Sequence, residues 1–392
     1  MKTVYVLAAK RTPIGSFGGA FAAVSATVLA AQLARNILEE LNFDGHQIDE
    51  VFLGNVISAN LGQAPARQVA VKAGLPNHVP VSLINKVCAS GMKAVMLAAQ
   101  GIQLGMNDLV LAGGMENMSQ VPYYLDRARF GYNYGHGQVL DGLARDGLTD
   151  PYDDMAMGCF ADSTAERYAL SREEQDAYAI QSYKRAAKAW DEGWMKAEVL
   201  PIAVQDRKGN STLVEEDEEY KKVFFDKIPK LKPAFTKQGT VTAANASTLN
   251  DGAAFLLLAS GDMVDKLGAK PIAKITAYAD AAREPKWFTL APILATEKVL
   301  RQAQIGIEAI DYFEVNEAFS AVPLAYAKHL NVDQAAMNIF GGAVSLGHPL
   351  GCSGARILVT LINVLKQRNA KRGLAAICNG GGGASAMIVE SL

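Results

Sequence analysis

The sequence predicts an α/β protein, from an alternation of apolar and helical segments and from an internal repeat. Short runs of valine, isoleucine and leucine alternate with alanine-rich stretches of helical period at Thr27–Leu41, Gly91–Leu104 and Ala355–Arg368. This alternation is typical of buried strands connected by helices. The apolar runs that start at Asp108 and Gly373 both reach glycines, so we expect strands buried on both faces that break there.

The first expected strand, Thr3–Ala9, is seven residues long and is followed at once by Lys10–Pro13. It is too short for a transmembrane span or the core of a signal peptide. No membrane partner is predicted.

Three short sequence motifs, or words, recur in the same order in the two parts of the chain. The first set is a strand ending at Asn55, a helix opened by Ser90-Gly91 and a strand ending at Gly113-Gly114; the second is a strand ending at Asn316, a helix opened by Ser353-Gly354 and a strand ending at Cys378-Asn379-Gly380. The recurrence predicts two copies of one α/β unit, with coincidence as the alternative. We place the halves at residues 1–267 and 268–392.

A segment of different character, about residues 119–239, interrupts the first half. It begins rich in tyrosine and glycine and continues with a polar helix, Arg172–Gly193, for which Ser171 and Glu174 form a capping box. The acidic run Glu215–Glu219 then gives way to a stretch rich in lysine. We expect an inserted loop domain whose lysines meet a phosphate-bearing ligand, or else only a solvated charged loop.

Composition excludes several classes of protein. In 392 residues, half are hydrophobic, a fifth are charged and the net charge is −2, so no nucleic-acid partner is indicated. Four cysteines and five histidines without paired metal spacing argue against a zinc site. Free thiols suit a reducing compartment. We expect the bacterial cytoplasm, with the mitochondrial matrix, for a mature chain, as the alternative.

Cys88 lies between the apolar run Val79–Ile84 and the helix that starts near Ser90. We expect it to cap that helix, where free backbone N–H groups and the helix dipole favour the nucleophilic thiolate. Its alternative interpretation is a small buried hydrophobic residue.

Two further segments carry polar groups at positions suited to catalysis. Asn316 follows a strand of the second half, where ligands bind in α/β folds, although a turn or cap is the simpler role. His348 is fixed between glycines and a proline just before a helix, which suits a general base or an oxyanion donor.

Cys378 ends a strand and is followed by four glycines after Asn379. Such a run brings backbone N–H groups close to a ligand, but lacks the Lys-Ser/Thr of a nucleotide-binding loop. If the halves are pseudo-symmetric, Cys88 and Cys378 converge beside His348, where a disulfide is the alternative to a pair of reactive thiols. Two thiols, an imidazole and backbone donors suit acyl transfer followed by carbon–carbon bond formation.

At these residues the chain resembles the thiolase family, from Lys10 to its end. The matching segments are Asn85-Lys-Val-Cys88-Ala-Ser-Gly, Asn316-Glu-Ala-Phe, Gly347-His348-Pro and Cys378-Asn-Gly380. The resemblance is closest to the acetoacetyl-CoA thiolases, through Gly239–Gly252. It implies a duplicated five-layered αβαβα fold with an inserted loop domain, and a homotetramer formed as a dimer of dimers.

The resemblance also implies the roles of site residues. Cys88 is the acylated nucleophile, His348 activates it, and Cys378 is the acid and base for the second substrate. His348 with a water held by Asn316 forms one oxyanion hole, and the N–H groups of Cys88 and Gly380 form the other. The residues implied for binding coenzyme A and the acyl group are Ser247, Lys222, Lys227, Met157, Ala246 and Phe319. No cofactor is required, and coenzyme A is substrate and product.

A potassium site is implied by residues similar to those of potassium-activated members: Tyr183, Ala243, Ala244, Ala246 and Val344. The chain departs from the family at Ala156, where many members carry His, at Asp162, where Glu is usual, and at Thr289, where branched-substrate members carry Pro. These departures predict a more open acyl pocket and put a 2-methyl substrate in question.

We therefore predict the interconversion of two acetyl-CoA with acetoacetyl-CoA and CoA. A longer-chain 3-ketoacyl-CoA thiolase is the first alternative. A decarboxylating ketoacyl synthase normally needs a second histidine where Asn316 stands, and a non-catalytic CoA- or nucleotide-binding module would not need Cys88.

Overall fold

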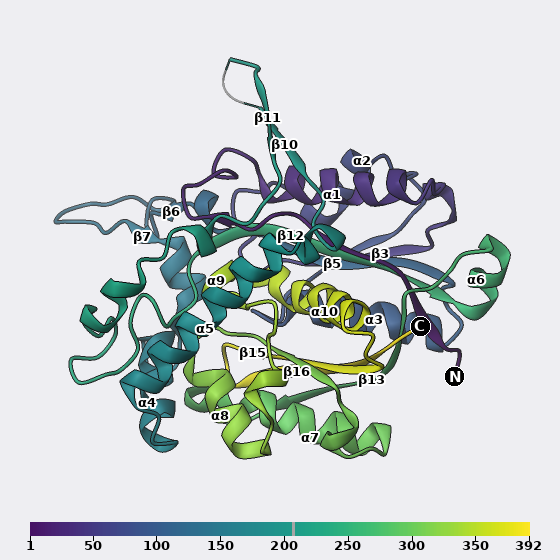
Figure 1. Ribbon diagram of the computed structural model, residues 1–392. Helices are drawn as coiled ribbons and strands as arrows, with labels where there is room; N and C mark the ends of the chain where they lie inside the picture. Colours follow the sequence, from purple (N-terminus) through teal and green to yellow (C-terminus); the bar gives the residue numbers. More distant parts are fainter. Residues whose placement is uncertain (206–207) are drawn as a thin grey trace.

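The computed structural model describes residues 1–205 and 208–392. Its centre is one continuous mixed sheet whose two halves lie one above the other. Helices lie between these halves and on the outer face of each (Figure 1). The strand order is β14-β15-β16-β13-β1-β12-β5-β3-β4, and β2 pairs with β12. The strands are β1 (Val4–Arg11), β2 (Gly15–Ser16), β3 (Glu50–Gly54), β4 (Val81–Ile84), β5 (Leu109–Asn117), β12 (Asn250–Ser260), β13 (Ala273–Ala282), β14 (Tyr312–Val315), β15 (Arg372–Asn379) and β16 (Gly383–Ser391).

The two ends of this sheet repeat one topology, as the three recurring words predict. In the first half β3 runs parallel to β5, which is antiparallel to β12, and in the second β14 runs parallel to β15, which is antiparallel to β16. The halves join where β1 pairs with β13, Val4 opposite Ile275. The two strands that the apolar runs predict, β5 and β15, are buried along all or nearly all of their length.

The helices and the two halves of the sheet alternate in five layers, which can be followed from top to bottom in Figure 1. Helices α1 and α2 cover the first half of the sheet, α7 and α8 lie against the second, and α3 and α10 pack between the halves. Their bounds are α1 (Ala26–Glu40), α2 (Pro65–Ala73), α3 (Ser90–Gln103), α7 (Ala291–Ala303), α8 (Ala321–Leu330) and α10 (Leu350–Gln367). Along the chain, the short α6 (Gly261–Leu267) follows β12 and the short α9 (Ala343–Leu346) precedes α10. The predicted α/β architecture is confirmed.

Two predicted boundaries are wrong for the same reason, the contact between the central helix and the first half. Helix α10 begins at Leu350, three residues before the predicted opening at Ser353-Gly354, and β5 continues beyond Gly113-Gly114 to Asn117. A Cβ atom on Gly114 would collide with the carbonyl oxygen of Gly351. The glycine therefore serves close approach to α10 and does not end the strand.

The central helices also meet through small residues at their starts. A Cβ atom on Gly91 of α3 would lie 2.8 Å from the backbone nitrogen of Ala355, and one on Gly354 of α10 would lie 2.5 Å from that of Met92. The N-terminal ends of α3 and α10 thus lie side by side. Residues that precede these helices come together in the middle of the molecule.

The segment between residues 119 and 239 forms helices and hairpins outside the five layers, at the left and top of Figure 1. It contains α4 (Met157–Arg167), α5 (Arg172–Asp191) and the hairpins β6 (Tyr123–Tyr124) with β7 (Leu140–Asp141), β8 (Thr149–Asp150) with β9 (Met155–Ala156) and β10 (Ile202–Gln205) with β11 (Ser211–Val214). The predicted capping box is confirmed: Ser171 accepts from the N–H of Glu174, whose carboxylate accepts from the N–H of Ser171. The proposed division into halves with an inserted domain stays a prediction.

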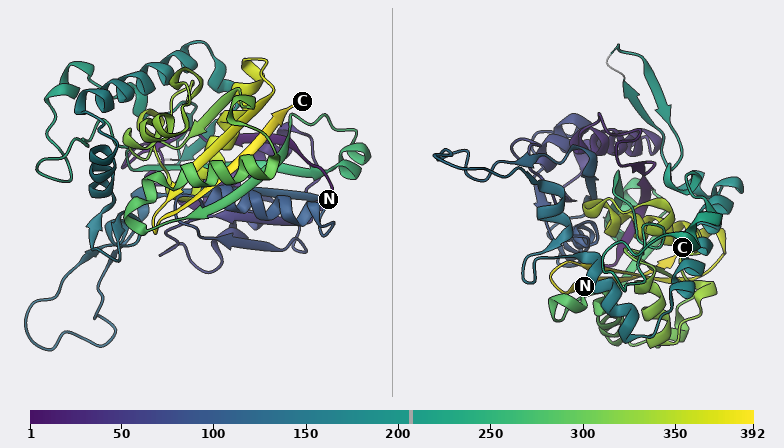
Figure 2. Two further views of the ribbon diagram at one scale, coloured as in Figure 1. Left: turned by 90° about the horizontal axis from the view of Figure 1, so that it is seen from below. Right: turned by 90° about the vertical axis from the view of Figure 1, so that its left-hand side faces the viewer.

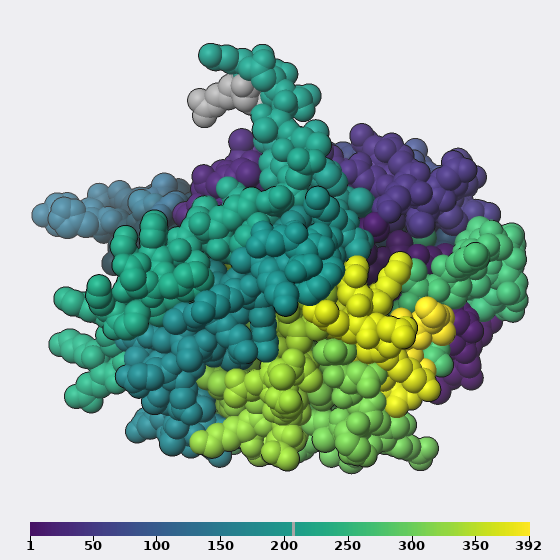
Figure 3. All heavy atoms as spheres, viewed as in Figure 1, coloured from purple at the N-terminus to yellow at the C-terminus, as the bar shows by residue number. Residues whose placement is uncertain are grey.

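Figure 2 shows that two hairpins project far from the body, the loop between β6 and β7 and the pair β10 and β11. The space-filling view shows the same projections (Figure 3). The loop between β6 and β7 carries exposed aromatic side chains, with Phe130 88% and Tyr134 104% exposed.

Candidate active site

Cys88 lies in a tight loop between β4 and α3. Ala89 is the N-cap of α3, so the prediction that Cys88 caps the helix is wrong by one residue. The loop is closed by Ser90, whose Oγ accepts from the N–H of Lys86 at 2.8 Å and donates to the carbonyl of Val87 at 2.6 Å. Val87 has a φ of 47°, which is unusual for a β-branched residue and bends the chain sharply before Cys88.

The Cys88 thiol is protonated at neutral pH. Burial raises its pKa to about 12, and the backbone N–H groups of Gly380 and of Cys88 itself only partly oppose this. The predicted preference for the thiolate is therefore wrong, because desolvation outweighs the helix terminus. A neighbouring base must take the proton when this thiol reacts.

His348 lies in the turn between α9 and α10 and has a defined tautomer. Its Nδ1 is 2.6 Å from Oγ of Ser353, and that hydroxyl donates its single hydrogen to the carbonyl of Pro349 at 2.8 Å. Nδ1 therefore carries a hydrogen and donates, which leaves Nε2 as the basic nitrogen. Burial, and then the Arg356 guanidinium, lower the pKa of His348 to about 3, so the ring is neutral at physiological pH.

The backbone of the same turn is fixed by Asn250. Its Oδ1 accepts from the N–H of His348 at 2.9 Å, and its Nδ2 donates to the carbonyl of Gly15 at 3.1 Å. Gly347 has a φ of 110°, and a Cβ atom there would collide with the Asn250 amide. His348 is therefore held by hydrogen bonds at both its backbone N–H and its ring.

One small pocket lies between the two halves and takes in Cys88 and His348. Its volume is about 60 Å³. Its lining comes from the starts of α3 and α10, the inserted segment and the loops of the second half: Val87, Cys88, Gly147, Leu148, Met157, Ser247, Phe288, Ala318, Phe319, His348, Leu350 and Gly380. The pocket is much smaller than the neighbouring cavity of about 440 Å³, so it suits a small chemical group.

The pocket adjoins a wider cavity of about 440 Å³. The two share Val87, Gly147, Met157 and Gly380. The two cavities therefore lie on either side of a shared wall.

Cys378 lies near the end of β15 and is not among the residues that line the small pocket. It is 1% exposed, and all four cysteines are free thiols, so the structure contains no Cys88–Cys378 disulfide. Burial and the charge of Cys88 raise its pKa well above the usual range. The two sulfurs are thus near enough to interact electrostatically.

Asn316 follows β14 and is buried. Its backbone N–H donates to the carbonyl of Ala376 at 2.9 Å, but neither atom of its side-chain amide has a partner among the described residues. Buried amides are rarely left unpaired, so this side chain is suited to binding a ligand or a water.

Glu116 is a buried carboxylate that sequence reasoning missed. It accepts from the side chain of Asn55 at 2.6 Å and from the N–H groups of Val56, Ile57 and Gly351 at 2.9, 3.2 and 2.9 Å. Burial raises its pKa to about 7. It joins the loop after β3 to the start of α10, and no spacing in the sequence distinguishes it from an ordinary strand residue.

The residues expected to bind the substrate do not all lie together. Ser247, Met157 and Phe319 line the small pocket, and Ala246 pairs with Phe319 in an isolated β-bridge. The two lysines lie outside its lining. Lys222 donates to Oγ of Ser16, and the Lys227 ammonium lies 4.1 Å from the centre of the Phe224 ring.

Two of the residues expected at a potassium site share one apolar cluster, Tyr183 and Val344. Burial and the charges of Glu219 and Glu317 raise the pKa of the Tyr183 hydroxyl above its usual range, so negative charge lies near this tyrosine. Across residues 1–205 and 208–392, no group of three or more His, Cys, Asp or Glu residues is arranged to hold a metal ion.

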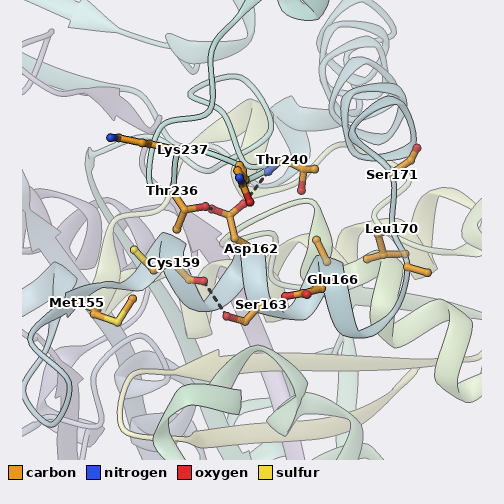
Figure 4. Close-up of a pocket in the computed structure, with 14 residues that line it drawn as sticks. Met155, Cys159, Asp162, Ser163, Glu166, Leu170, Ser171, Thr236, Lys237 and Thr240 are labelled. Atoms are coloured by element: carbon orange, nitrogen blue, oxygen red, sulfur yellow. Dashed lines mark hydrogen bonds between the residues drawn. The ribbon is translucent and has the colours of Figure 1, made fainter.

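A separate open cavity of about 810 Å³ runs along α4 and contains none of the residues expected to react (Figure 4). Asp162 organises it by accepting from the hydroxyl of Thr236 and from the N–H groups of Thr240 and Val241. Asp162, where Glu was expected, thus holds the loop over the cavity.

A thiol and a neutral imidazole just before the two central helices, with a buried second thiol near the end of β15, define the class of this protein as an α/β enzyme. The descriptions "Thiolase, N-terminal domain" and "Thiolase, C-terminal domain" match residues 4–262 and 269–391. The chain belongs to the thiolase family.

Relatives and solved structures agree over the full length. Acetyl-CoA acetyltransferase 2 of Arabidopsis thaliana is 50% identical over 393 residues, covering 100% of this chain and 98% of the relative. The acetyl-CoA acetyltransferase of Bacillus anthracis is 40% identical with a TM-score of 0.97, covering 100% and 99% of the two chains. The Acat5 thiolase of Ascaris suum, in complex with coenzyme A, is 45% identical with a TM-score of 0.94 and full coverage of both. No helix in the described part of this chain is long and apolar enough to cross a membrane.

Proposed function

We propose that this enzyme is an acetyl-CoA C-acetyltransferase that converts two acetyl-CoA into acetoacetyl-CoA and CoA, reversibly. The observation that carries the proposal is the pocket of about 60 Å³ around Cys88 and His348, which suits an acetyl group. The names of full-length relatives support the same activity, and favour it over a longer-chain thiolase.

In the first half-reaction the Cys88 sulfur attacks the thioester carbonyl of acetyl-CoA while Nε2 of His348 takes its proton. The tetrahedral intermediate expels the CoA thiolate, which takes a proton from Cys378, and Cys88 becomes an acetyl thioester. Burial disfavours both the Cys88 thiolate and the His348 imidazolium, so the proton moves to Nε2 in concert with the attack of the sulfur and not before it.

In the second half-reaction the Cys378 thiolate takes a proton from the α-carbon of a second acetyl-CoA. The raised pKa of Cys378 makes this thiolate a strong base. The enolate attacks acetyl-Cys88, a carbon–carbon bond forms, and the Cys88 thiolate leaves and regains its proton from His348.

Two sets of donors are proposed for the oxygen charges. The N–H groups of Cys88 and Gly380, which already act on the Cys88 sulfur, would hold the tetrahedral intermediate. Protonated His348 and a water on the unpaired amide of Asn316 would hold the enolate. Ser247, Met157, Ala246 and Phe319 would contact the pantetheine and acyl groups, with Lys222 and Lys227 near the phosphates. The coenzyme A complex of the Ascaris relative supports such a ligand.

The function is tested by CoA-dependent cleavage of acetoacetyl-CoA and of a six-carbon 3-ketoacyl-CoA. We expect the four-carbon substrate to be cleaved much faster. A rate that rises with acyl length would overturn the assignment in favour of the longer-chain alternative, and binding of CoA without cleavage of either would indicate a non-catalytic module.

Cys88 and His348 themselves are expected to add no step to the pH profile of the acylation rate on either side of neutrality. His348, with a lowered pKa of about 3, stays neutral, and Cys88, with a raised pKa of about 12, stays protonated, so the reactive pair does not change between about pH 5 and pH 9. The rate of single-turnover acylation by acetyl-CoA, measured across this pH range, tests the prediction. Glu116, with a pKa of about 7, is expected to add a step. A step near neutrality that persists in Glu116→Gln would contradict the neutral pair.

Ser353→Ala is expected to slow acylation about 10- to 100-fold, because the imidazole loses the acceptor that fixes its ring and tautomer. The Michaelis constant for acetyl-CoA should change little. Ser353→Thr keeps the hydroxyl and should recover most of the rate, whereas an equal loss in both variants would speak against this role.

We also propose that potassium binds near Tyr183 and Val344, with backbone atoms of Ala243, Ala244 and Ala246 as further contacts. Nearby Glu219 and Glu317 favour a cation there. The steady-state rate should be higher in potassium than in sodium at equal ionic strength, and equal rates would remove the site.

A homotetramer and a cytoplasmic location complete the proposal. The exposed aromatic residues on the projecting loop between β6 and β7 suit a contact between subunits. Light scattering after size exclusion tests the tetramer. Free thiols suit both the cytoplasm and the mitochondrial matrix, and cell fractionation tests the choice.

A further inference from the structure

The loop that carries Cys88 is strained and must be held in place. Val87 has a positive φ, which is strained for a β-branched residue and persists only where the surroundings impose it. Within the first half, Asn85 supports this bend by donating to the carbonyl of Val56 at 3.1 Å and accepting from the N–H of Val87 at 3.0 Å. These bonds fix the shape of the loop, but not its place relative to the second half.

The side chain of Lys86 crosses to the second half. Its ammonium has three hydrogens and three partners there: the carboxylate of Asp280 at 2.5 Å, Oγ of Ser385 at 2.8 Å and the carbonyl of Ala384 at 3.1 Å. Ser385 also donates to Asp280 at 2.6 Å. All the donors of the ammonium are therefore used on two adjacent strands, β13 and β16.

One of these strands, β16, is connected directly to the segment that carries Gly380. Strand β16 starts at Gly383, directly after the glycine run that includes Gly380. Lys86 precedes Cys88 by two residues, and Ala384 follows Gly380 by four. The hydrogen bonds of Lys86 to β13 and β16 thus connect the loop that carries Cys88 to the segment that carries Gly380. The N–H of Gly380 is the second backbone donor to the Cys88 sulfur.

We propose that Lys86 is a positioning residue that sets the Cys88 sulfur against the N–H of Gly380 and against Cys378. The proposal rests on the proposed function and adds a residue to it. Lys86 acts through geometry: the groups that act on the Cys88 thiol are the buried surroundings, backbone N–H groups and Glu116, and do not include this ammonium. A displacement of about 1 Å in a reacting group can cost about 100-fold in rate.

The chain offers a matched control in Lys93. Its ammonium donates to the other oxygen of the same Asp280 carboxylate at 2.8 Å, and its side chain is about as exposed, 26% against 24% for Lys86. Lys93 belongs to α3 and does not form part of the loop. Lys93→Met therefore removes a comparable ion pair without releasing Cys88.

The experiment compares wild type, Lys86→Met and Lys93→Met in the full-length enzyme. We expect Lys86→Met to slow single-turnover acetylation of Cys88, and its alkylation by iodoacetamide, by about 10- to 100-fold, with little change in the Michaelis constant. Lys93→Met should stay within about threefold of wild type while losing a similar amount of thermal stability.

Equal rates in the two variants would overturn the proposal. If Lys86→Met does not fold, Ser385→Ala removes one of the three bonds and should give an intermediate loss, whereas an unchanged rate would again overturn it. A wild-type enzyme that forms no acetyl-Cys88 would instead refute the proposed function, so the two failures are distinguishable.

Discussion

Cys88→Ser is expected to abolish acyl transfer, lowering thiolysis of acetoacetyl-CoA by about 10⁴-fold or more. A hydroxyl is a far weaker acid than a thiol, and the neighbouring imidazole, with its pKa lowered to about 3, is too weak a base to compensate. Mass spectrometry of the protein after incubation with acetyl-CoA measures the result: wild type gains one acetyl group and the variant gains none.

Cys159→Ser is the control for this substitution. It changes a cysteine that lines the separate cavity along α4, so acetylation should be unaffected. An acetylated Cys88→Ser protein with wild-type turnover would show that another residue is the nucleophile.

Cys378→Ser is expected to separate the two half-reactions. Acetylation of Cys88 should continue slowly, because attack needs only Cys88 and His348, whereas condensation should fall by about 10³-fold or more because no thiolate remains to deprotonate the second substrate. Rapid-quench measurement of acetyl-enzyme and of acetoacetyl-CoA follows the two steps separately. If both steps fell equally, Cys378 would not be specific to the second substrate.

Much of the architecture could be predicted because its signals are local or repeated. The helical period located α1 and α3 to within one residue at their starts, since their buried faces recur every three to four residues. The recurring words identified the duplicated topology. The start of α10 was missed because it depends on a contact with Gly114, distant in sequence.

The site could be predicted only in part. Cys88, His348 and Gly380 were singled out by glycines and segment ends, and they do line one pocket. Ser353 was seen only as the start of a helix, and its hydrogen bond to the imidazole depends on a turn geometry that spacing does not reveal. The protonation of Cys88 was wrongly predicted because desolvation depends on the whole fold around the residue.

The contact between α10 and the first half has a consequence for how the polypeptide acquires its structure. Helix α10 comes from the C-terminal part of the sequence but packs on β5 and β12 as well as on β14 and β15. A fragment ending at residue 267 would keep α1 and α3 against β5 and β12 but lose the contact of these strands with α10, and the remaining fragment would lose the same contact. We therefore expect active enzyme to return from separated fragments only when both are present together.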